Sequence, residues 1–220
     1  MVLNINKPKG ITSHDVVDEV RRQTGERRVG HAGTLDPFAT GVLVVAVGRE
    51  DTKKLTEITK NTKKEYVATL ELGKTSTTGD PEGQISLVSL SYPHLSEIKD
   101  TLRSFVGEIK QTPPPYSAIK VKGVPAYKLA RRGVNVVLPS RKVQIHEIGV
   151  LKYSPPSLKI RVVCSAGTYI RSLAKDIGET LGTGAYLTEL ERTRVGDFTI
   201  KDSISLEQLR LLKSRLGVDN

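Results

Sequence analysis

Two strand patterns follow one another over residues 142–165, and this succession constrains the fold more than any other feature of the sequence. Residues 142–153 and 158–165 both read as strands, and no helical pattern separates them. Parallel neighbours need a crossover of roughly a dozen residues or more, whereas antiparallel neighbours can be joined by a tight turn. The two segments therefore predict an antiparallel pair within an α+β fold that has a mixed, largely antiparallel sheet and flanking helices.

Hydrophobic periodicity predicts the other elements of this fold. Residues 42–47 are an uninterrupted apolar run, which is typical of a buried central strand. Residues 65–72 alternate, which predicts a half-buried strand with Tyr66 at its start. Ser13 is expected to cap the first helix and Gly25 to end it. Further strands are expected at 2–6 and 185–193, and helices at 13–24, 50–60, 96–106, 168–181 and from 205 onwards.

The length of 220 residues and the absence of any linker-like segment favour a single domain over residues 1–220. No run of about 18 apolar residues occurs, so no membrane attachment is expected. Cys164 is the single cysteine, which allows no intramolecular disulfide. The first residues lack the pattern of a secretory signal, so a cytoplasmic location is expected.

The charge of the chain is concentrated in one segment. The net charge is +10, and residues 112–161 contain ten basic residues and one acidic residue. The same segment contains Tyr116, Tyr127 and Tyr153, so it is typical of a surface that binds a polyanion and stacks on its bases. A solvated basic face and an anionic membrane surface are the alternatives. Charge alone favours nucleic acid as the partner.

Several common cofactor motifs are incomplete. Gly73-Lys74-Thr75 resembles the end of a phosphate-binding loop, but the glycine required five residues earlier is Ala68. Gly182-Thr183-Gly184 lacks the third glycine of a dinucleotide motif and follows a helical pattern. The four histidines and Cys164 show no metal-ligand spacing. We therefore expect no metal and no other cofactor.

The loop over residues 30–41 is the segment most suggestive of a site. It contains three glycines together with His31 and Asp36, between an expected helix and a buried strand. Such a glycine content costs backbone entropy, unless the backbone must approach something closely. The alternative is a local turn in which Asp36 makes a hydrogen bond before Pro37. Spacing alone leaves both interpretations open.

This loop closely resembles the catalytic motif of the TruB family, the tRNA pseudouridine-55 synthases. The resemblance continues along the chain in segments that occur in the order of the family. They are Asn6-Lys7-Pro8-Lys9-Gly10, Gly30-His31-Ala32-Gly33-Thr34-Leu35-Asp36-Pro37, Lys64-Glu65-Tyr66, Thr78-Gly79-Asp80, Tyr116-Ser117-Ala118-Ile119-Lys120, Gly167-Thr168-Tyr169-Ile170-Arg171 and Leu190-Glu191-Arg192. The resemblance implies an isomerase that converts uridine 55 in the T loop of tRNA into pseudouridine by base flipping.

The resemblance also implies roles for individual residues. Asp36 is the implied catalytic aspartate, and His31 belongs to the base-flipping region. Tyr66 contacts the target base. Tyr169, Arg171 and Leu190 line the pocket, and Arg171 is the candidate cation partner of Asp36. From the residues alone, Tyr66 and Tyr169 are better interpreted as core tyrosines with satisfied hydroxyls, and Arg171 could be a structural arginine on a helix surface.

Many bacterial members continue into a C-terminal RNA-binding module of the PUA type, and the sequence reads as a short form without it. The basic segment 112–161 is then expected to make a larger share of the contacts with RNA. No obligatory protein partner is expected. Two other functions stay open. One is a non-catalytic RNA-binding or tRNA-folding module, against which Asp36 argues, and the other is a subunit of a guide-RNA-dependent pseudouridine synthase.

Overall fold

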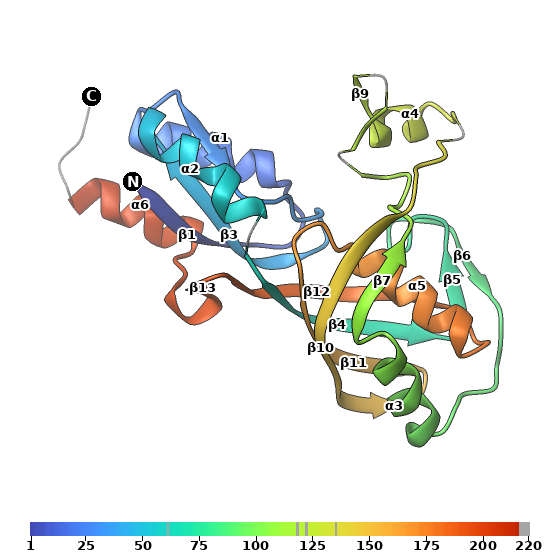
Figure 1. Ribbon diagram of the computed structural model, residues 1–220. Coiled ribbons are helices and arrows are strands. Elements are labelled where there is room, and N and C mark those ends of the chain that lie inside the picture. The colour runs from blue at the N-terminus through green and yellow to red at the C-terminus, as the bar shows by residue number, and fades with distance from the viewer. Residues whose placement is uncertain (61, 118, 122, 135, 216–220) are drawn as a thin grey trace. The chain divides into compact units, whose positions relative to one another are not determined.

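The computed structural model describes residues 1–60, 62–117, 119–121, 123–134 and 136–215 (Figure 1). Ala118, within one of the motifs above, and Lys122, in the basic segment, lie outside the described residues. The chain divides into two compact units: unit 1 comprises residues 1–67 and 189–220, and unit 2 comprises residues 68–188. The strands β4 (Lys64–Leu72) and β12 (Ala185–Val195) contribute residues to both units. The expected single catalytic domain stays a prediction.

Unit 1 contains a mixed sheet. Its strands lie in the order β1 (Val2–Lys7), β3 (Thr40–Val47), the end of β12 and the start of β4. Two short strands extend it: β2 (Val29–His31) pairs with β3, and β13 (Phe198–Thr199) pairs with β12. β1 and β2 run antiparallel to β3, whereas β12 runs parallel to it, with Arg192 opposite Gly41. The predicted mixed sheet is confirmed.

Helices cover both faces of β3. On one face, α1 (Ser13–Thr24) and α6 (Leu206–Arg215) pack with Leu43 and Val45 into one apolar cluster. On the other face, α2 (Arg49–Lys60) and the short helix η1 (Ile200–Asp202) supply apolar side chains to a cluster around Val42 and Val44. This two-sided burial confirms that residues 42–47 form a buried strand, and it explains why their apolar run shows no alternation.

The start of α1 differs from the prediction. Thr12, and not Ser13, is the N-cap: its hydroxyl accepts from the N–H of Asp15, and the Asp15 carboxylate accepts from the N–H of Thr12. Ser13 is the first helical residue, and its hydroxyl bonds elsewhere. The prediction was wrong because Ser and Thr are both good caps, and the acidic residue three positions on selects Thr12.

Unit 2 contains the antiparallel hairpin that the sequence predicts. β10 (Arg141–Ser154) pairs with β11 (Ser157–Cys164), and two register irregularities interrupt the ladder. β4 continues the sheet beside β11, and β7 (Gly107–Gln111) continues it beside β10. β7 has no clear alternation in the sequence, which explains why it is not among the predicted strands.

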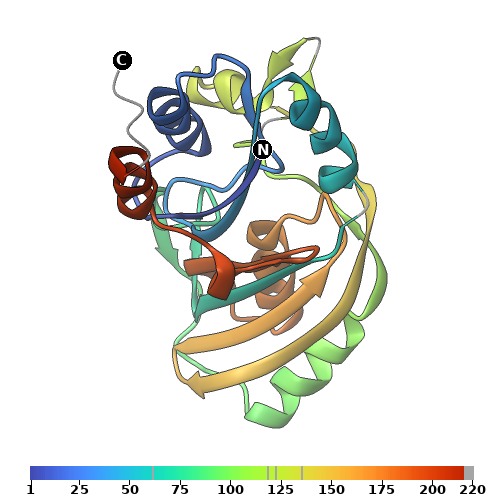
Figure 2. The same cartoon turned by 90° about the vertical axis from the view of Figure 1, so that its left-hand side faces the viewer.

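Helices α3 (Leu95–Ser104) and α5 (Ile170–Thr180) belong to the same unit, and Figure 2 shows α3 beside β10. A short strand, β5 (Lys74–Ser76), pairs with β6 (Ile85–Leu87). Within the basic segment lie β8 (Lys120–Val121), β9 (Val124–Pro125) and α4 (Ala126–Arg131).

Candidate active site

Asp36 lies in unit 1, in the loop that joins the antiparallel strands β2 and β3. Its side chain is half-exposed, whereas its neighbours Leu35 and Phe38 are buried. The apolar neighbours therefore anchor the loop in the core and leave the aspartate at the surface. This is the arrangement expected for a functional group on a loop held by a rigid scaffold.

Ser13 fixes the residue before the aspartate. Its hydroxyl accepts a hydrogen bond from the N–H of Leu35 at 2.8 Å and donates one to the carbonyl of Leu35 at 3.1 Å. Both main-chain polar groups of Leu35 are thereby satisfied by the first residue of α1. The position of Asp36 is tied to this helix and not only to its own strands.

Lys7 fixes the residue after the aspartate. Its ammonium is fully buried and donates to the carbonyls of Pro8, Ile11 and Pro37 at 2.8, 2.8 and 3.3 Å. Burial lowers the pKa of Lys7 to about 8, and the negative charge of Asp36 opposes this decrease. Lys7 is therefore still mainly protonated at neutral pH, and its charge acts on the carboxylate.

Arg192 holds the glycines of the loop. Its guanidinium is 1% exposed and donates from Nε to the carbonyl of Val42 at 2.8 Å and from an Nη to the carbonyl of Gly33 at 3.0 Å. A Cβ at Gly41 would lie 2.3 Å from the carbonyl oxygen of Arg192, and Gly41 has a φ of +102°. The glycine at position 41 is therefore required by a close approach to β12, as the glycine content of this loop suggested.

A third buried cation, Lys64, lies at the same loop. A Cβ at Gly33 would come within 3.0 Å of the Lys64 ammonium nitrogen and 3.6 Å of an Nη of Arg192. Lys7, Lys64 and Arg192 thus place buried positive charge around a loop that carries one half-exposed carboxylate. Such a shell favours the ionised form of a carboxylate and orients it in advance.

The sequence reasoning did not assign roles to these three cations or to Ser13. Lys7, Lys64 and Arg192 lie within the family motifs, yet nothing in their sequence context separates a buried cation from an exposed one.

His31 ends β2, at the start of the same loop. Its Nδ1 is buried and has no hydrogen-bond partner among the described residues. Burial, with the charge of Arg192 as a smaller cause, lowers the pKa of His31 to about 4. The imidazole is therefore neutral at physiological pH, in a form suited to stacking rather than to binding phosphate.

Tyr66 and Leu190 also belong to unit 1, on β4 and β12, and both are buried. Tyr66 is the third residue of its strand, close to the predicted start. Its burial agrees with a pocket residue and with the alternative core tyrosine. The assigned roles of both residues stay predictions.

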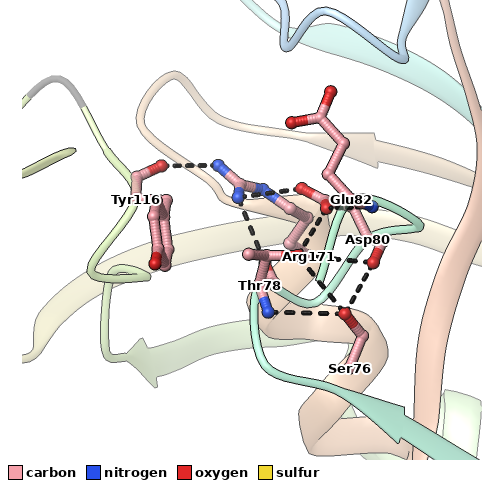
Figure 3. A network of polar contacts seen from close by, with 6 residues as sticks. All are labelled: Ser76, Thr78, Asp80, Glu82, Tyr116 and Arg171. Atoms are coloured by element: carbon pink, nitrogen blue, oxygen red, sulfur yellow. Dashed lines mark hydrogen bonds and ion pairs between the residues drawn. The ribbon is translucent and has the colours of Figure 1, made fainter. Parts of the chain in front are cut away.

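Tyr169 and Arg171 belong to unit 2, at the start of α5. Arg171 is 6% exposed, so it is not the helix-surface arginine of the alternative interpretation. It donates to the carbonyls of Thr78 at 3.1 Å and Tyr116 at 2.7 Å, and it pairs with the carboxylate of Asp80 at 3.1 Å (Figure 3). The predicted pairing of Arg171 with Asp36 stays a prediction.

Asp80 is the centre of this second polar network. Its carboxylate accepts from the hydroxyl of Thr78 at 2.5 Å, from the N–H of Glu82 at 3.1 Å and from Arg171. Figure 3 shows these groups around the Asp80 carboxylate, and the hydroxyl of Ser76 donates to the main-chain carbonyl of Asp80. The sequence indicates this loop only as part of a family motif, and the ion pair with Arg171 depends on the tertiary structure.

The basic segment presents exposed cations on unit 2. Lys120, Lys128, Arg131 and Arg132 are exposed on or beside β8 and α4. Arg131 also lies over the ring of Tyr127, with 5.8 Å between the guanidinium carbon and the ring centre. Cations and an aromatic ring therefore share one surface, which agrees with an interface for nucleic acid.

No group of three or more His, Cys, Asp or Glu side chains among the described residues is arranged to hold a metal ion. None of the described helices combines the length and the apolar character that a bilayer crossing needs.

Comparison with known families gives two matches. The model of the TruB family pseudouridylate synthase N-terminal domain matches residues 21–170, and that of the tRNA pseudouridylate synthase B C-terminal domain matches residues 171–215. Together they include the loop of Asp36 and the start of α5.

Curated relatives agree with these matches. A tRNA pseudouridine synthase B of Francisella tularensis is 46% identical over 211 residues, which are 95% of this chain and 69% of that protein. Another, from Desulfotalea psychrophila, is 48% identical over 207 residues, which are 91% of this chain and 84% of that protein.

Solved structures show the same fold at lower identity. A Cbf5-Nop10-Gar1 complex contains a chain that is 32% identical, with a TM-score of 0.77, and the match covers 99% of this chain and 56% of that one. An H/ACA RNP bound to a substrate RNA gives 30% identity and a TM-score of 0.73 over 100% of this chain and 56% of that one. The chain thus spans little more than half the length of these structural relatives.

Proposed function

The chain belongs to the TruB family of pseudouridylate synthases, and we propose that it converts uridine 55 in the T loop of tRNA into pseudouridine with Asp36 as its catalytic carboxylate. The observation that carries the proposal is the half-exposed Asp36 on a loop braced by buried Lys7 and Arg192. The loop is held through its main chain, so the carboxylate is placed before substrate arrives. Preorganised charge of this kind is usually a large contribution to catalysis.

The reaction needs no cofactor to balance. The bond between C1′ of ribose and N1 of uracil breaks, the base turns, and a bond between C1′ and C5 forms. C5 loses a proton and N1 gains one, so no electrons or atoms are exchanged with another reactant. The lack of a recognisable cofactor motif in the sequence agrees with this chemistry.

Asp36 can assist the cleavage in three ways. Positive charge develops on the sugar as the glycosidic bond breaks, and an ionised carboxylate can stabilise it electrostatically, trap it covalently or remove a C2′ proton. All three need the charged form of Asp36. The positive charge of buried Lys7 and Arg192 supports that form, because a nearby opposite charge favours ionisation.

Base flipping gives the aromatic and apolar residues their proposed roles. A uridine within a folded loop must leave its stack, which costs a few kcal/mol, and stacking on an aromatic ring offsets part of that cost. We assign Tyr66 to the target base, Tyr169, Arg171 and Leu190 to the pocket, and neutral His31 to the base-flipping region. The low pKa of His31 supports a stacking role for its imidazole.

We assign RNA binding to the basic segment 112–161 of unit 2. Its exposed cations suit the backbone of the tRNA T stem-loop, and its partly exposed tyrosines suit the bases. No membrane and no obligatory protein partner enter the proposal, and the cytoplasm, where tRNA is abundant and Cys164 stays reduced, is the proposed location.

Pseudouridine formation in a bare tRNA transcript tests the function. The purified chain, after exhaustive chelation and dialysis, should modify uridine 55 without guide RNA or added cofactor. A requirement for guide RNA would favour a guide-dependent subunit, and tight binding without product would favour a non-catalytic RNA-binding module. Loss of activity that one metal ion restores would contradict the cofactor-free mechanism.

A further inference from the structure

Tyr169 is held by a side chain from a distant strand. Gln111, which ends β7 and is 1% exposed, accepts a hydrogen bond from the N–H of Tyr169 at 2.7 Å and donates one to the carbonyl of Tyr169 at 3.0 Å. One carboxamide thus satisfies both main-chain polar groups of this residue, as a neighbouring strand would. Tyr169 is the N-cap of α5 and makes no side-chain cap bond of its own.

The segment that follows Gln111 holds the next residues of α5 as well. The hydroxyl of Ser172 donates to the carbonyl of Thr112 at 2.8 Å, and Arg171 donates to the carbonyl of Tyr116 at 2.7 Å. The prolines at 113–115 stiffen the chain between these two contacts. The first turn of α5 is therefore fixed by one stiff segment, beginning at Gln111.

Arg141 holds the ring of the same tyrosine. It lies directly opposite Gln111 in the pairing of β10 with β7, and its guanidinium carbon is 4.8 Å from the centre of the Tyr169 ring. The Nε of Arg141 is buried and has no hydrogen-bond partner among the described residues. The stacking contact with Tyr169 therefore helps to orient this guanidinium.

We propose that Gln111 and Arg141 form a clamp that positions Tyr169 for the flipped uridine, an inference that rests on the pocket role proposed for Tyr169. Gln111 fixes the main chain of the tyrosine and Arg141 fixes the plane of its ring. Both are positioning residues, because they act through Tyr169 and not on the substrate. A ring that is fixed in advance loses less conformational freedom when the base arrives. We therefore expect the clamp to raise the rate of the chemical step.

Single-turnover rates at saturating tRNA, measured with dissociation constants, test the clamp. Arg141→Lys keeps the charge but not the planar stack, and Gln111→Met keeps the volume but not the two hydrogen bonds. We expect each variant to lower the rate about tenfold while tRNA affinity changes less than about twofold. Arg103→Lys and Gln84→Met, both at exposed positions of unit 2, are the matched controls and should retain full rate. Weaker tRNA binding with an unchanged saturated rate would overturn the proposal and indicate that Arg141 binds a phosphate directly.

A double-mutant cycle with Tyr169→Leu separates positioning from general structural support. If Arg141 acts through the ring, Arg141→Lys should slow the wild type but should not slow Tyr169→Leu further. Independent, additive effects on the rate would overturn the clamp.

The same cycle on the free energy of unfolding requires no activity. Arg141 and Tyr169 should show coupling in this measurement, and its absence would also contradict the clamp. A wild type that makes no pseudouridine but shows this coupling would defeat the proposed function and leave the clamp standing.

Discussion

Asp36 in unit 1 and Asp80 in unit 2 are both aspartates in glycine-containing loops beside buried cations, yet their surroundings differ. Asp80 is 3% exposed, and Arg171, Thr78 and the main chain of Glu82 all bond to its carboxylate. Asp36 is half-exposed, and Lys7 and Arg192 bind carbonyls of its loop. The carboxylate of Asp80 is thus bound directly by its neighbours, and the loop that carries Asp36 is braced through its main chain.

The largest expected effect is at Asp36. Asp36→Asn keeps the size of the side chain and removes its charge, so product formation should fall by about 10³-fold or more, to background. The loop is held by main-chain contacts, so the free energy of unfolding and the tRNA affinity should change little. Pseudouridine assays, chemical denaturation and tRNA binding on the same preparation check this. Substantial turnover by the variant would remove Asp36 from the catalytic role.

Substitutions of Tyr66 test whether its hydroxyl transfers a proton during the reaction. If the Tyr66 hydroxyl moves a proton when C5 rejoins the sugar, Tyr66→Phe and Tyr66→Leu should both lose about 10²–10⁴-fold in single-turnover rate. If Tyr66 only stacks on the base, Tyr66→Phe should retain most activity and only Tyr66→Leu should lose about 1–3 kcal/mol of stacking. We expect the first result. Full activity in both variants would exclude Tyr66 from the site.

Substitution of Asp80 should lower the free energy of unfolding much more than substitution of Asp36 does. Asp80→Asn removes the carboxylate that pairs with the buried Arg171 guanidinium at 3.1 Å, so the free energy of unfolding should fall by about 3–5 kcal/mol. Thermal and chemical unfolding beside Asp36→Asn measure the contrast. Equal stability of the two variants would break the distinction between a structural and a catalytic aspartate.

The basic segment should affect binding without affecting chemistry. Replacing Lys120, Lys122, Arg131 and Arg132 by Gln should weaken tRNA binding and reduce the log–log salt slope by roughly one unit for each lost phosphate contact, while the saturated rate changes much less. The four-fold exchange of exposed Lys53, Lys54, Lys99 and Lys175 to Gln is a control with the same change in net charge. An identical salt slope in both variants would support the alternative interpretation, that the segment is a solvated basic face that does not bind RNA.

The smallest expected effect is a pH dependence that belongs to the Asp36 loop. The pKa of His31 is about 4 in the folded state and 6.5 ordinarily, so the unfolded chain binds more protons between these values. Acidification through this window should lower the free energy of unfolding by at most about 1.4 kcal/mol per pH unit. His31→Gln should flatten this dependence, whereas His146→Gln in unit 2 should not. Identical pH profiles for the two variants would contradict the burial of a neutral imidazole.

Much of the fold could be predicted from local patterns. The apolar run at 42–47, the alternation at 65–72 and the strand succession at 142–165 each correspond to an observed strand. The short strand β7 and the N-cap at Thr12 were missed, because a few residues carry too little periodicity and adjacent Ser and Thr compete for the same cap.

Some residues of the candidate site could be predicted from the local sequence, and others could not. His31 and Asp36 could be selected because one short loop contains both residues. Tyr66, Tyr169, Arg171 and Leu190 depended on family resemblance, since nothing local distinguishes them from core or surface residues. The contacts of Lys7 with Pro37 and of Arg192 with Val42 join positions 30 and 150 residues apart, so no local window contains them.

The sequence by itself determined the order of the main strands and helices, the family and the residue proposed for catalysis, because periodicity and motifs are properties of neighbouring residues. Only the tertiary structure decided which charges are buried and what they hold. Lys7 and Arg192 brace one aspartate loop through its carbonyls, Arg171 pairs with the carboxylate of another, and Gln111 binds the main chain of Tyr169. The physical reason is that desolvation and hydrogen-bond partners depend on which distant segments pack together, and composition does not encode that pairing locally.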